Sequence, residues 1–143
     1  MSMIDISAKA SVHRKAVASG KIFLKSETLE KIHEGKIKKG DPLAVGQTAA
    51  ILAVKQTPFL IPFCHPIQIT SVDVQLMFEK DHIEATCTVQ AVEKTGVEME
   101  ALVGVTNALN TIWDMVKYLE KDAQGQYPST RISDVNVLSK IKG

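Results

Sequence analysis

The chain has 143 residues, of which 45% are apolar and 23% are charged, and these values are ordinary for one globular domain. Its 17 Lys and Arg residues nearly balance 16 Asp and Glu residues, which argues against a broad nucleic-acid-binding surface but allows a local basic pocket. No apolar run is long enough to span a bilayer, and the N-terminus lacks the apolar core of a signal peptide. The two cysteines provide no disulfide framework, so we expect a reduced, cytoplasmic protein.

The N-terminal part of the chain is the least patterned. Residues 1 to about 12 show no helical or strand periodicity, and we expect them to be mobile. A short strand is predicted within residues 16–26, and a helix follows over residues 26–35. Ser26 is the expected N-cap of this helix, and Gly35 is the expected stop.

The next helix has a clearer start. Asp41 is a favoured N-cap residue, and Pro42 fits the first helical position, where its missing N–H costs nothing. The helix is predicted to end at Pro58. Because it is apolar on most sides, we expect it to be largely buried.

A hairpin follows, with a turn near Lys80 and Asp81. Apolar residues alternate with polar ones on both of its strands, which predicts one buried face. Cys87 falls in the inward register and is expected to be a small core residue. The predicted inward residues are Val72, Val74, Leu76, Phe78, Ile83, Ala85, Cys87, Val89 and Ala91.

The strongest helical pattern runs from Thr95 to about Lys121, and Thr95 with Glu98 fits a capping box. A last strand is predicted over residues 131–141. The order β-α-α-β-β-α-β indicates a single α+β domain over residues 1–143, with a mainly antiparallel sheet packed against helices. The preferred version is a ferredoxin-like core with one extra helix.

The segment IPFCHPI, residues 61–67, is the first candidate for chemistry. Each proline forces the residue before it out of the helical region, so Ile61 and His65 sit on a stiff connector. A rigid connector is a good mount for a catalytic or binding side chain. The alternative is a packed loop with a hydrogen-bonded histidine. A metal site is not expected, because the spacing to the other Cys and His residues does not fit a zinc site.

Asp114 is unusual because it lies in the middle of the long helix, between Trp113 and Met115. Aspartate is a poor helix former there, and Lys117 lies on the same face three residues later. The pair is either a surface ion pair of small energetic value or a partly buried acid–base pair.

Glu98 is explained by the capping box, whereas Glu100 is not. Fourteen residues separate Glu100 from Asp114, which places them about 20 Å apart along the helix axis. Either the two carboxylates serve different tasks, or a second subunit brings one of them to the other. We favour a site built across an oligomer interface.

Several cations occur near predicted loops and helix ends. Each alone is most simply a solvated surface charge, but if several converged they would suit a phosphorylated ligand. No Walker or dinucleotide-binding glycine motif is present. These cations are Arg14, Lys38, Lys39, Lys55, Lys140 and Lys142.

Four segments together, VGQTAAILAVKQT, IPFCHPI, KTGVEMEALVGV and LNTIWDMVKYLEKD, resemble the molybdenum cofactor biosynthesis protein C (MoaC) family. The opening IDISAKA and the segment around Arg14 match too. The resemblance implies a ferredoxin-like fold, a homohexamer built as a trimer of dimers, and sites at subunit interfaces. It implies conversion of 3′,8-cyclo-7,8-dihydroguanosine 5′-triphosphate to cyclic pyranopterin monophosphate with release of pyrophosphate. A radical S-adenosylmethionine enzyme would make that substrate, and the reaction would need no cofactor, metal, nucleic acid or membrane.

The same resemblance assigns roles to individual residues. Asp114 and Lys117 match the catalytic aspartate and lysine. The substrate-binding positions are Phe63, Cys64, His65, Glu98, Met99, Glu100, Lys39, Lys55, Arg14 and Lys140. The C-terminus departs from the family pattern, because VLSKIKG keeps Lys140 but has no Gly-Gly-Lys-Ser-Gly run.

Two other function classes remain open from the sequence. A ligand-sensing module on the same fold would bind a nucleotide or pterin without turnover. An RNA-binding domain would need exposed aromatic residues on the strands, whereas the polar face of the hairpin offers Thr, Gln, Asp and Glu.

Overall fold

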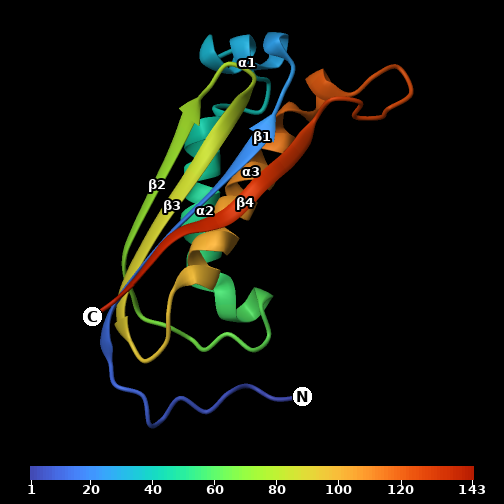
Figure 1. The fold of residues 1–143 in the computed structure, drawn as a ribbon. Coiled ribbons are helices and arrows are strands. Elements are labelled where there is room, and N and C mark those ends of the chain that lie inside the picture. The colour runs from blue at the N-terminus through green and yellow to red at the C-terminus, as the bar shows by residue number, and fades with distance from the viewer.

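The computed structural model describes residues 1–143, and its centre is a four-stranded antiparallel sheet (Figure 1). The strands are β1 (Val12–Phe23), β2 (Ile69–Phe78), β3 (His82–Glu93) and β4 (Arg131–Lys142). The helices are α1 (Ser26–His33), α2 (Pro42–Leu60) and α3 (Glu98–Glu120). The strand order is β2-β3-β1-β4. The predicted α+β fold and element order are confirmed, and the arrangement is compatible with a ferredoxin-like core to which α1 is added.

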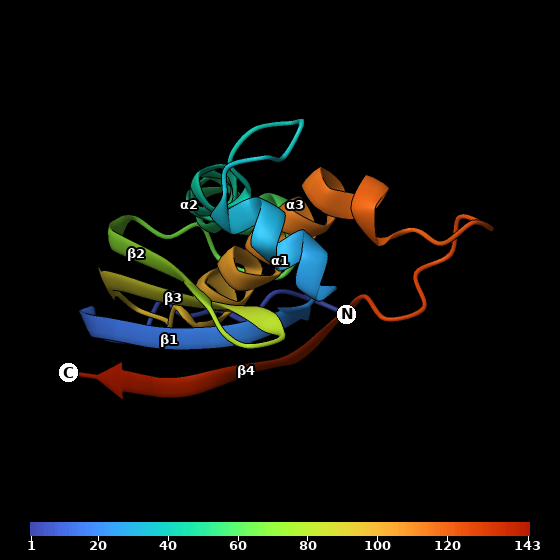
Figure 2. The same ribbon diagram turned by 90° about the horizontal axis from the view of Figure 1, so that it is seen from above.

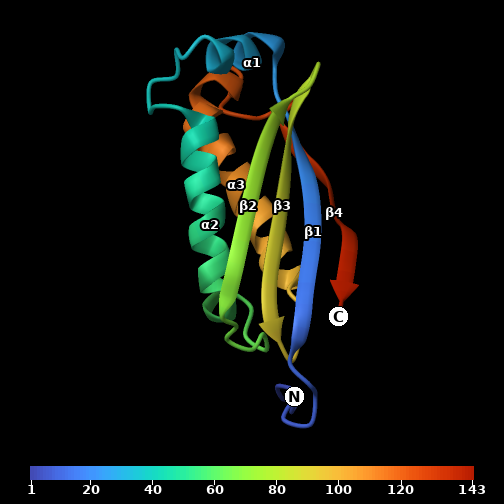
Figure 3. The ribbon, with the colours of Figure 1, turned by 90° about the vertical axis from the view of Figure 1, so that its left-hand side faces the viewer.

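All three helices cover the same face of the sheet (Figure 2). Helices α2 and α3 run side by side along it, and α1 lies across one end (Figure 3). The core lies between these layers and is built from small residues on the sheet, among them Ala16, Ala18 and Ala85, which are buried. Gly104 allows α3 to approach closely, because a side chain there would collide with Cys87 Sγ and Val54.

The hairpin forms in the predicted register. Val74 pairs with Cys87 and Leu76 pairs with Ala85 in the β2–β3 ladder. The turn at Lys80 and Asp81 is closed by a bond from Glu79 N to His82 O of 2.9 Å. Cys87 is fully buried, as expected for a core residue. The predicted alternation is confirmed over most of the hairpin, because a half-covered sheet needs one apolar face, but Phe78 at the end of β2 is 36% exposed.

The start of α1 differs from the prediction. The N-cap is Lys25 rather than Ser26, and no side chain of the segment itself caps the helix. The fully buried Glu120 at the end of α3 holds the start of this helix in place, because its carboxylate accepts hydrogen bonds from Lys25 N and the Thr28 hydroxyl. The stop is as predicted, since Gly35 has φ of 71° just beyond the last turn.

The start of α2 is as predicted, with Asp41 accepting a hydrogen bond from Leu43 N at 2.9 Å. Its end is not, because the helix continues past Pro58 to Leu60. Proline at this position leaves the carbonyl of Val54 without its helical N–H. The Thr57 hydroxyl lies 3.0 Å from that oxygen and donates to it, which allows the helix to continue.

Two further expectations about the helices are wrong. Helix α3 begins at Glu98 with Val97 as N-cap, so Thr95 and Glu98 form no capping box. Helix α2 is only half buried within one chain, because an apolar strip faces away from α3 and the sheet. Its exposed residues include Val45 and Leu52, and Leu52 is 54% exposed. No helix in the chain is both long and apolar enough to cross a membrane.

Candidate functional site

A cavity of about 370 Å³ lies at the start of α3. Three segments line it: the connector between α2 and β2, the start of α3, and the N-terminal residues. The connector places His65 in the wall of this cavity, and the role of His65 as a binding side chain stays a prediction. The sequence-predicted residues in this wall are Phe63, Cys64, His65, Glu98, Met99 and Glu100.

The N-terminal wall was not foreseen from the sequence. Ile4, Ile6 and Lys9 line the cavity, although this segment has no regular secondary structure. The His65 ring donates from Nε2 to the carbonyl of Ile4 at 2.7 Å, and Lys94 Nζ donates to Ser7 O at 3.3 Å. Periodicity could not reveal this wall, because single hydrogen bonds rather than a helix or strand hold it. The mobility expected for residues 1–12 stays a prediction.

Glu100 is the most perturbed acid in the cavity. Its side chain is 2% exposed, and burial raises its pKa to about 7, with a further contribution from the negative charge of Glu98. The nearby Cys64 thiol has its pKa raised by burial and by both carboxylates. At neutral pH the cavity therefore contains a neutral thiol and an acid close to its midpoint, which can give or take a proton.

Glu98 is held differently from Glu100. Lys140 Nζ, from β4, lies 3.3 Å from Glu98 Oε1, whereas the buried Oε2 has no hydrogen-bond partner. Gly96 leaves the room that the carboxylate needs, because a side chain at Gly96 would collide with it. A buried acceptor without a partner is a position where a bound ligand can donate a hydrogen bond.

Arg14 lies inside the fold rather than on a surface. It is 4% exposed and donates from Nε to Glu93 O and from Nη2 to Lys94 O, each at 3.2 Å. These bonds fix the end of β3 and the turn that leads to α3. Arg14 is thus tied to the backbone beside the cavity, and its role toward a ligand stays a prediction.

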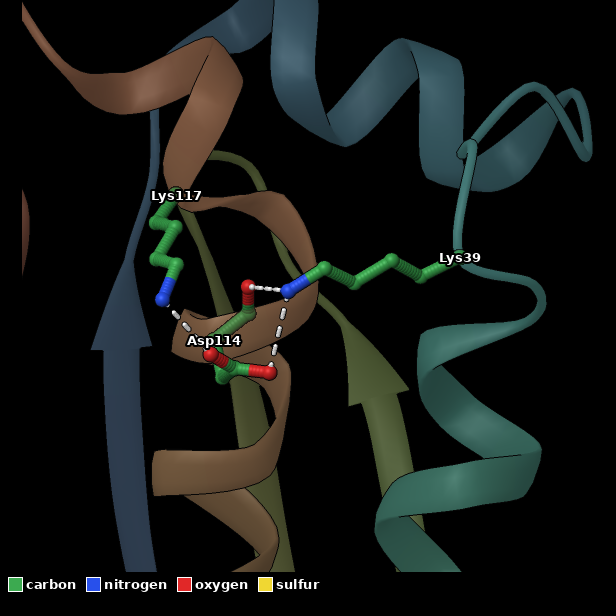
Figure 4. Close-up of polar contacts among 3 residues, drawn as sticks. All are labelled: Lys39, Asp114 and Lys117. Atoms are coloured by element: carbon green, nitrogen blue, oxygen red, sulfur yellow. Dashed lines mark hydrogen bonds and ion pairs between the residues drawn. The ribbon is translucent and has the colours of Figure 1, made fainter.

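A second polar cluster lies toward the other end of α3 (Figure 4). Asp114 Oδ1 is 2.9 Å from Lys117 Nζ, and Asp114 Oδ2 is 3.1 Å from Lys39 Nζ. The two ammonium groups lower the pKa of Asp114, and Asp114 raises the pKa of Lys117. The aspartate side chain is 58% exposed, so within one chain the pair is the surface ion pair, the first of the two alternatives left open by the sequence.

The segment between α1 and α2 delivers Lys39 to this cluster. Gly35 and Gly40 both have positive φ, of 71° and 122°, and they bound the turn that carries the lysine. Next to it, Lys38 N donates to the Tyr118 hydroxyl of α3 at 3.0 Å. The hydrogen bond from the Lys38 backbone N–H and the ion pair of Lys39 therefore hold this turn against α3.

The chain thus presents two clusters on one continuous helix rather than one closed site. The cavity group gathers around Glu98 and Glu100, and the ion-pair group gathers around Asp114, about 20 Å further along the axis. Lys140 joins the first group and Lys39 the second. Lys55 is exposed on α2 and joins neither. No group of three or more His, Cys, Asp or Glu side chains is arranged to hold a metal ion.

Comparison with known proteins identifies the family. The sequence pattern described as the MoaC family matches residues 3–143. A probable cyclic pyranopterin monophosphate synthase from Pyrococcus abyssi is 62% identical over 140 residues, which cover 98% of this chain and 88% of that protein. Proteins of the same name from Thermococcus onnurineus and Methanospirillum hungatei are 60% and 56% identical, each over 98% of this chain and 90% of the relative. Since the match runs along nearly the whole chain and includes both polar clusters, the chain belongs to the MoaC family.

Proposed function

We propose that the chain is a cyclic pyranopterin monophosphate synthase of molybdenum cofactor biosynthesis. It converts 3′,8-cyclo-7,8-dihydroguanosine 5′-triphosphate to cyclic pyranopterin monophosphate and pyrophosphate. The observation that carries this proposal is the 62% identity, over 98% of the chain, to a protein with that name. Under the same proposal the enzyme is a cytoplasmic lyase that receives its substrate from a radical S-adenosylmethionine enzyme.

The chemistry of the two clusters fits the steps of this reaction. Opening of the guanine-derived ring and closure of the pterin ring need proton transfers, and attack of a sugar hydroxyl on the α-phosphorus needs stabilised negative charge. Lys117 lowers the pKa of Asp114, and Asp114 raises the pKa of Lys117. At neutral pH Asp114 is therefore a carboxylate and Lys117 is an ammonium ion. Lys117 therefore enters the reaction as a proton donor, and Asp114 orients it or accepts a proton.

The cavity group supplies the binding site for the heterocycle. His65 donates from Nε2 to Ile4 O, so in the neutral form of the ring Nδ1 is the atom that can accept a hydrogen bond. Glu98 offers the buried oxygen without a partner, and Glu100 offers a carboxyl group close to its midpoint. The four basic substrate-binding positions are proposed to neutralise the triphosphate. They are Arg14, Lys39, Lys55 and Lys140.

These roles require the two clusters to meet around one substrate, which a single chain does not permit. We therefore include a homohexamer, a trimer of dimers, in the proposal, with the ion-pair cluster of one subunit docked at the cavity of its neighbour. The exposed apolar strip of α2 supports assembly, because monomeric proteins rarely leave such strips uncovered.

The direct test is turnover by Asp114→Asn and Lys117→Ala, compared with the unchanged protein. Both variants should release pyrophosphate at least about a hundredfold more slowly, as expected when an acid–base group is lost. Their melting temperatures should stay close to that of the parent, because the pair is exposed. Parent-like turnover by both folded variants would contradict the assignment. Binding of the substrate by the parent without pyrophosphate release would instead support a ligand-sensing module.

A further inference from the structure

The segment between α3 and β4, residues 121–130, projects from the body of the molecule at the end of α3 (Figures 1 and 2). We call it the arm. Its base is closed by a bond of 2.7 Å from the Thr130 hydroxyl to Glu120 Oε1. Glu120 and Thr130 are both buried, so the arm leaves and rejoins the core at a fixed point.

The arm has its own internal structure. Asp122 Oδ1 accepts hydrogen bonds from Gln124 N and Gln126 N, both at 2.9 Å, and Asp122 N donates to Gln126 O at 2.9 Å. Gly125, with φ of 76°, completes the turn. This closed turn holds the next residue, Tyr127, in a defined place.

Tyr127 folds back from the arm onto α3. Its ring meets the ring of Trp113 edge to face, with centroids 5.1 Å apart. Trp113 precedes Asp114 and lies one helical turn before Lys117, and residues four apart on a helix are neighbours on its surface. Tyr127 therefore lies on the part of α3 from which Lys117 projects.

We propose that Tyr127 is a positioning residue for Lys117, which it keeps directed at Asp114 instead of into solvent. Asp114 and Tyr127 are the titratable groups that act on Lys117, and Lys39 is paired with Asp114 at 3.1 Å. The electrostatics agree with the geometry, because the pKa of Lys117 is raised mainly by Asp114 and, to the smallest extent, by the negative charge that Tyr127 carries as a phenolate. The inference rests on the proposed function for its catalytic meaning, but the placement of Lys117 can be measured without substrate.

The test uses the full chain with Tyr127→Phe, which keeps the ring contact, and Tyr127→Leu, which removes it. Gln124→Ala, at the arm tip, is the matched control. The rate at which Lys117 reacts with an acylating reagent is followed against pH by mass spectrometry, with the exposed Lys31 as internal reference. We expect the pKa of Lys117 to fall in the phenylalanine variant, so that more reactive amine is present at a given pH, and to fall further in the leucine variant.

Turnover gives the second measurement. Tyr127→Leu should lower kcat about tenfold with a smaller change in KM, and Tyr127→Phe should recover part of the loss. If the Lys117 profiles of both variants coincide with that of Gln124→Ala, the inference is overturned. An unchanged kcat in Tyr127→Leu would also overturn it. A parent protein that releases no pyrophosphate contradicts the proposed function instead, while the Lys117 profile still decides the role of Tyr127.

Discussion

At the scale of single residues, burial rather than residue type separates the acids of this chain. Glu100 and Asp114 lie on the same helix and were both candidates from the sequence. Glu100 is 2% exposed and its pKa is raised to about 7, whereas the pKa of the exposed Asp114 is lowered by two ammonium groups. One carboxyl group is thus near its midpoint at neutral pH and the other is ionised, which suits them to different tasks.

Glu100 should make the stability of the protein depend on pH. Its pKa rises from the ordinary 4.5 to about 7 on folding. Between these pH values the folded state keeps a proton that the unfolded state has lost, so the free energy of unfolding falls as pH rises. Glu100→Gln should remove this loss, which is at most about 3 kcal/mol. Urea denaturation at pH 5 and pH 8 measures the change in the free energy of unfolding between these pH values.

The exposed Glu27→Gln is the control for this measurement, because it should leave the pH dependence of the parent unchanged. If Glu100→Gln and the parent lose the same free energy of unfolding between the two pH values, Glu100 is ionised in the folded protein. Its assignment as a proton-exchanging group would then be wrong.

At the scale of elements, helix ends are decided by partners that can be near or far in sequence. Pro58 would end α2 by local rules, yet the helix continues because the Thr57 hydroxyl replaces the missing N–H. Ser26 would cap α1 by local rules, yet the helix starts after Lys25, and Glu120 from α3 accepts hydrogen bonds from Lys25 N and the Thr28 hydroxyl. In both cases a polar side chain satisfies a backbone group that the sequence pattern leaves unassigned.

A double-mutant cycle can measure how far the Thr57 hydroxyl replaces the N–H that Pro58 lacks. Thr57→Val leaves the Val54 carbonyl without a donor and should lower the free energy of unfolding by about 1–2 kcal/mol. In the Pro58→Ala background the new N–H can bond to that carbonyl, so the same change should cost clearly less. Thr57→Ser keeps the hydroxyl and serves as the control. Equal costs of Thr57→Val in both backgrounds would show that the hydroxyl does not compensate for Pro58.

At the scale of the whole molecule, two features of the single chain suggest that it associates with other chains. The cavity and the ion-pair cluster are at different ends of α3, and the outer strip of α2 is apolar and uncovered. Association of several chains would address both, because it buries apolar surface and can bring one cluster to the other. The chain's own sheet cannot cover the outer strip of α2, because all the helices lie on one face of the sheet.

Assembly should therefore be sensitive to charge on the α2 strip. Leu52→Lys places a charge where the side chain is 54% exposed in the single chain, and it should convert the assembly to smaller species with little turnover. Light scattering of the parent should give about six times the chain mass of 15.6 kDa. Glu27→Lys, on α1, is the charge-matched control and should stay assembled. A parent protein that is monomeric and active would contradict the shared site.

Alternation and breakers were enough to predict seven elements in the right order, because a sheet covered on one side and helices packed on it impose simple periods. The first strand was predicted within residues 16–26, whereas β1 is longer and earlier, from Val12 to Phe23. The cavity was foreseen in part, since the two prolines marked the connector that carries His65. The wall from Ile4 to Lys9 was not foreseen, and neither was the burial of Arg14. Both depend on hydrogen bonds between segments far apart in the chain, which leave no local pattern.

The amino-acid sequence by itself determined the α+β fold, the hairpin register and the residue types gathered along α3, because these follow from local periodicity and from motifs. Only the tertiary structure decided which of those residues are buried, which ones meet, and what ends each helix. The physical reason is that burial and long-range hydrogen bonds set the protonation and direction of a side chain, and both depend on neighbours that folding supplies.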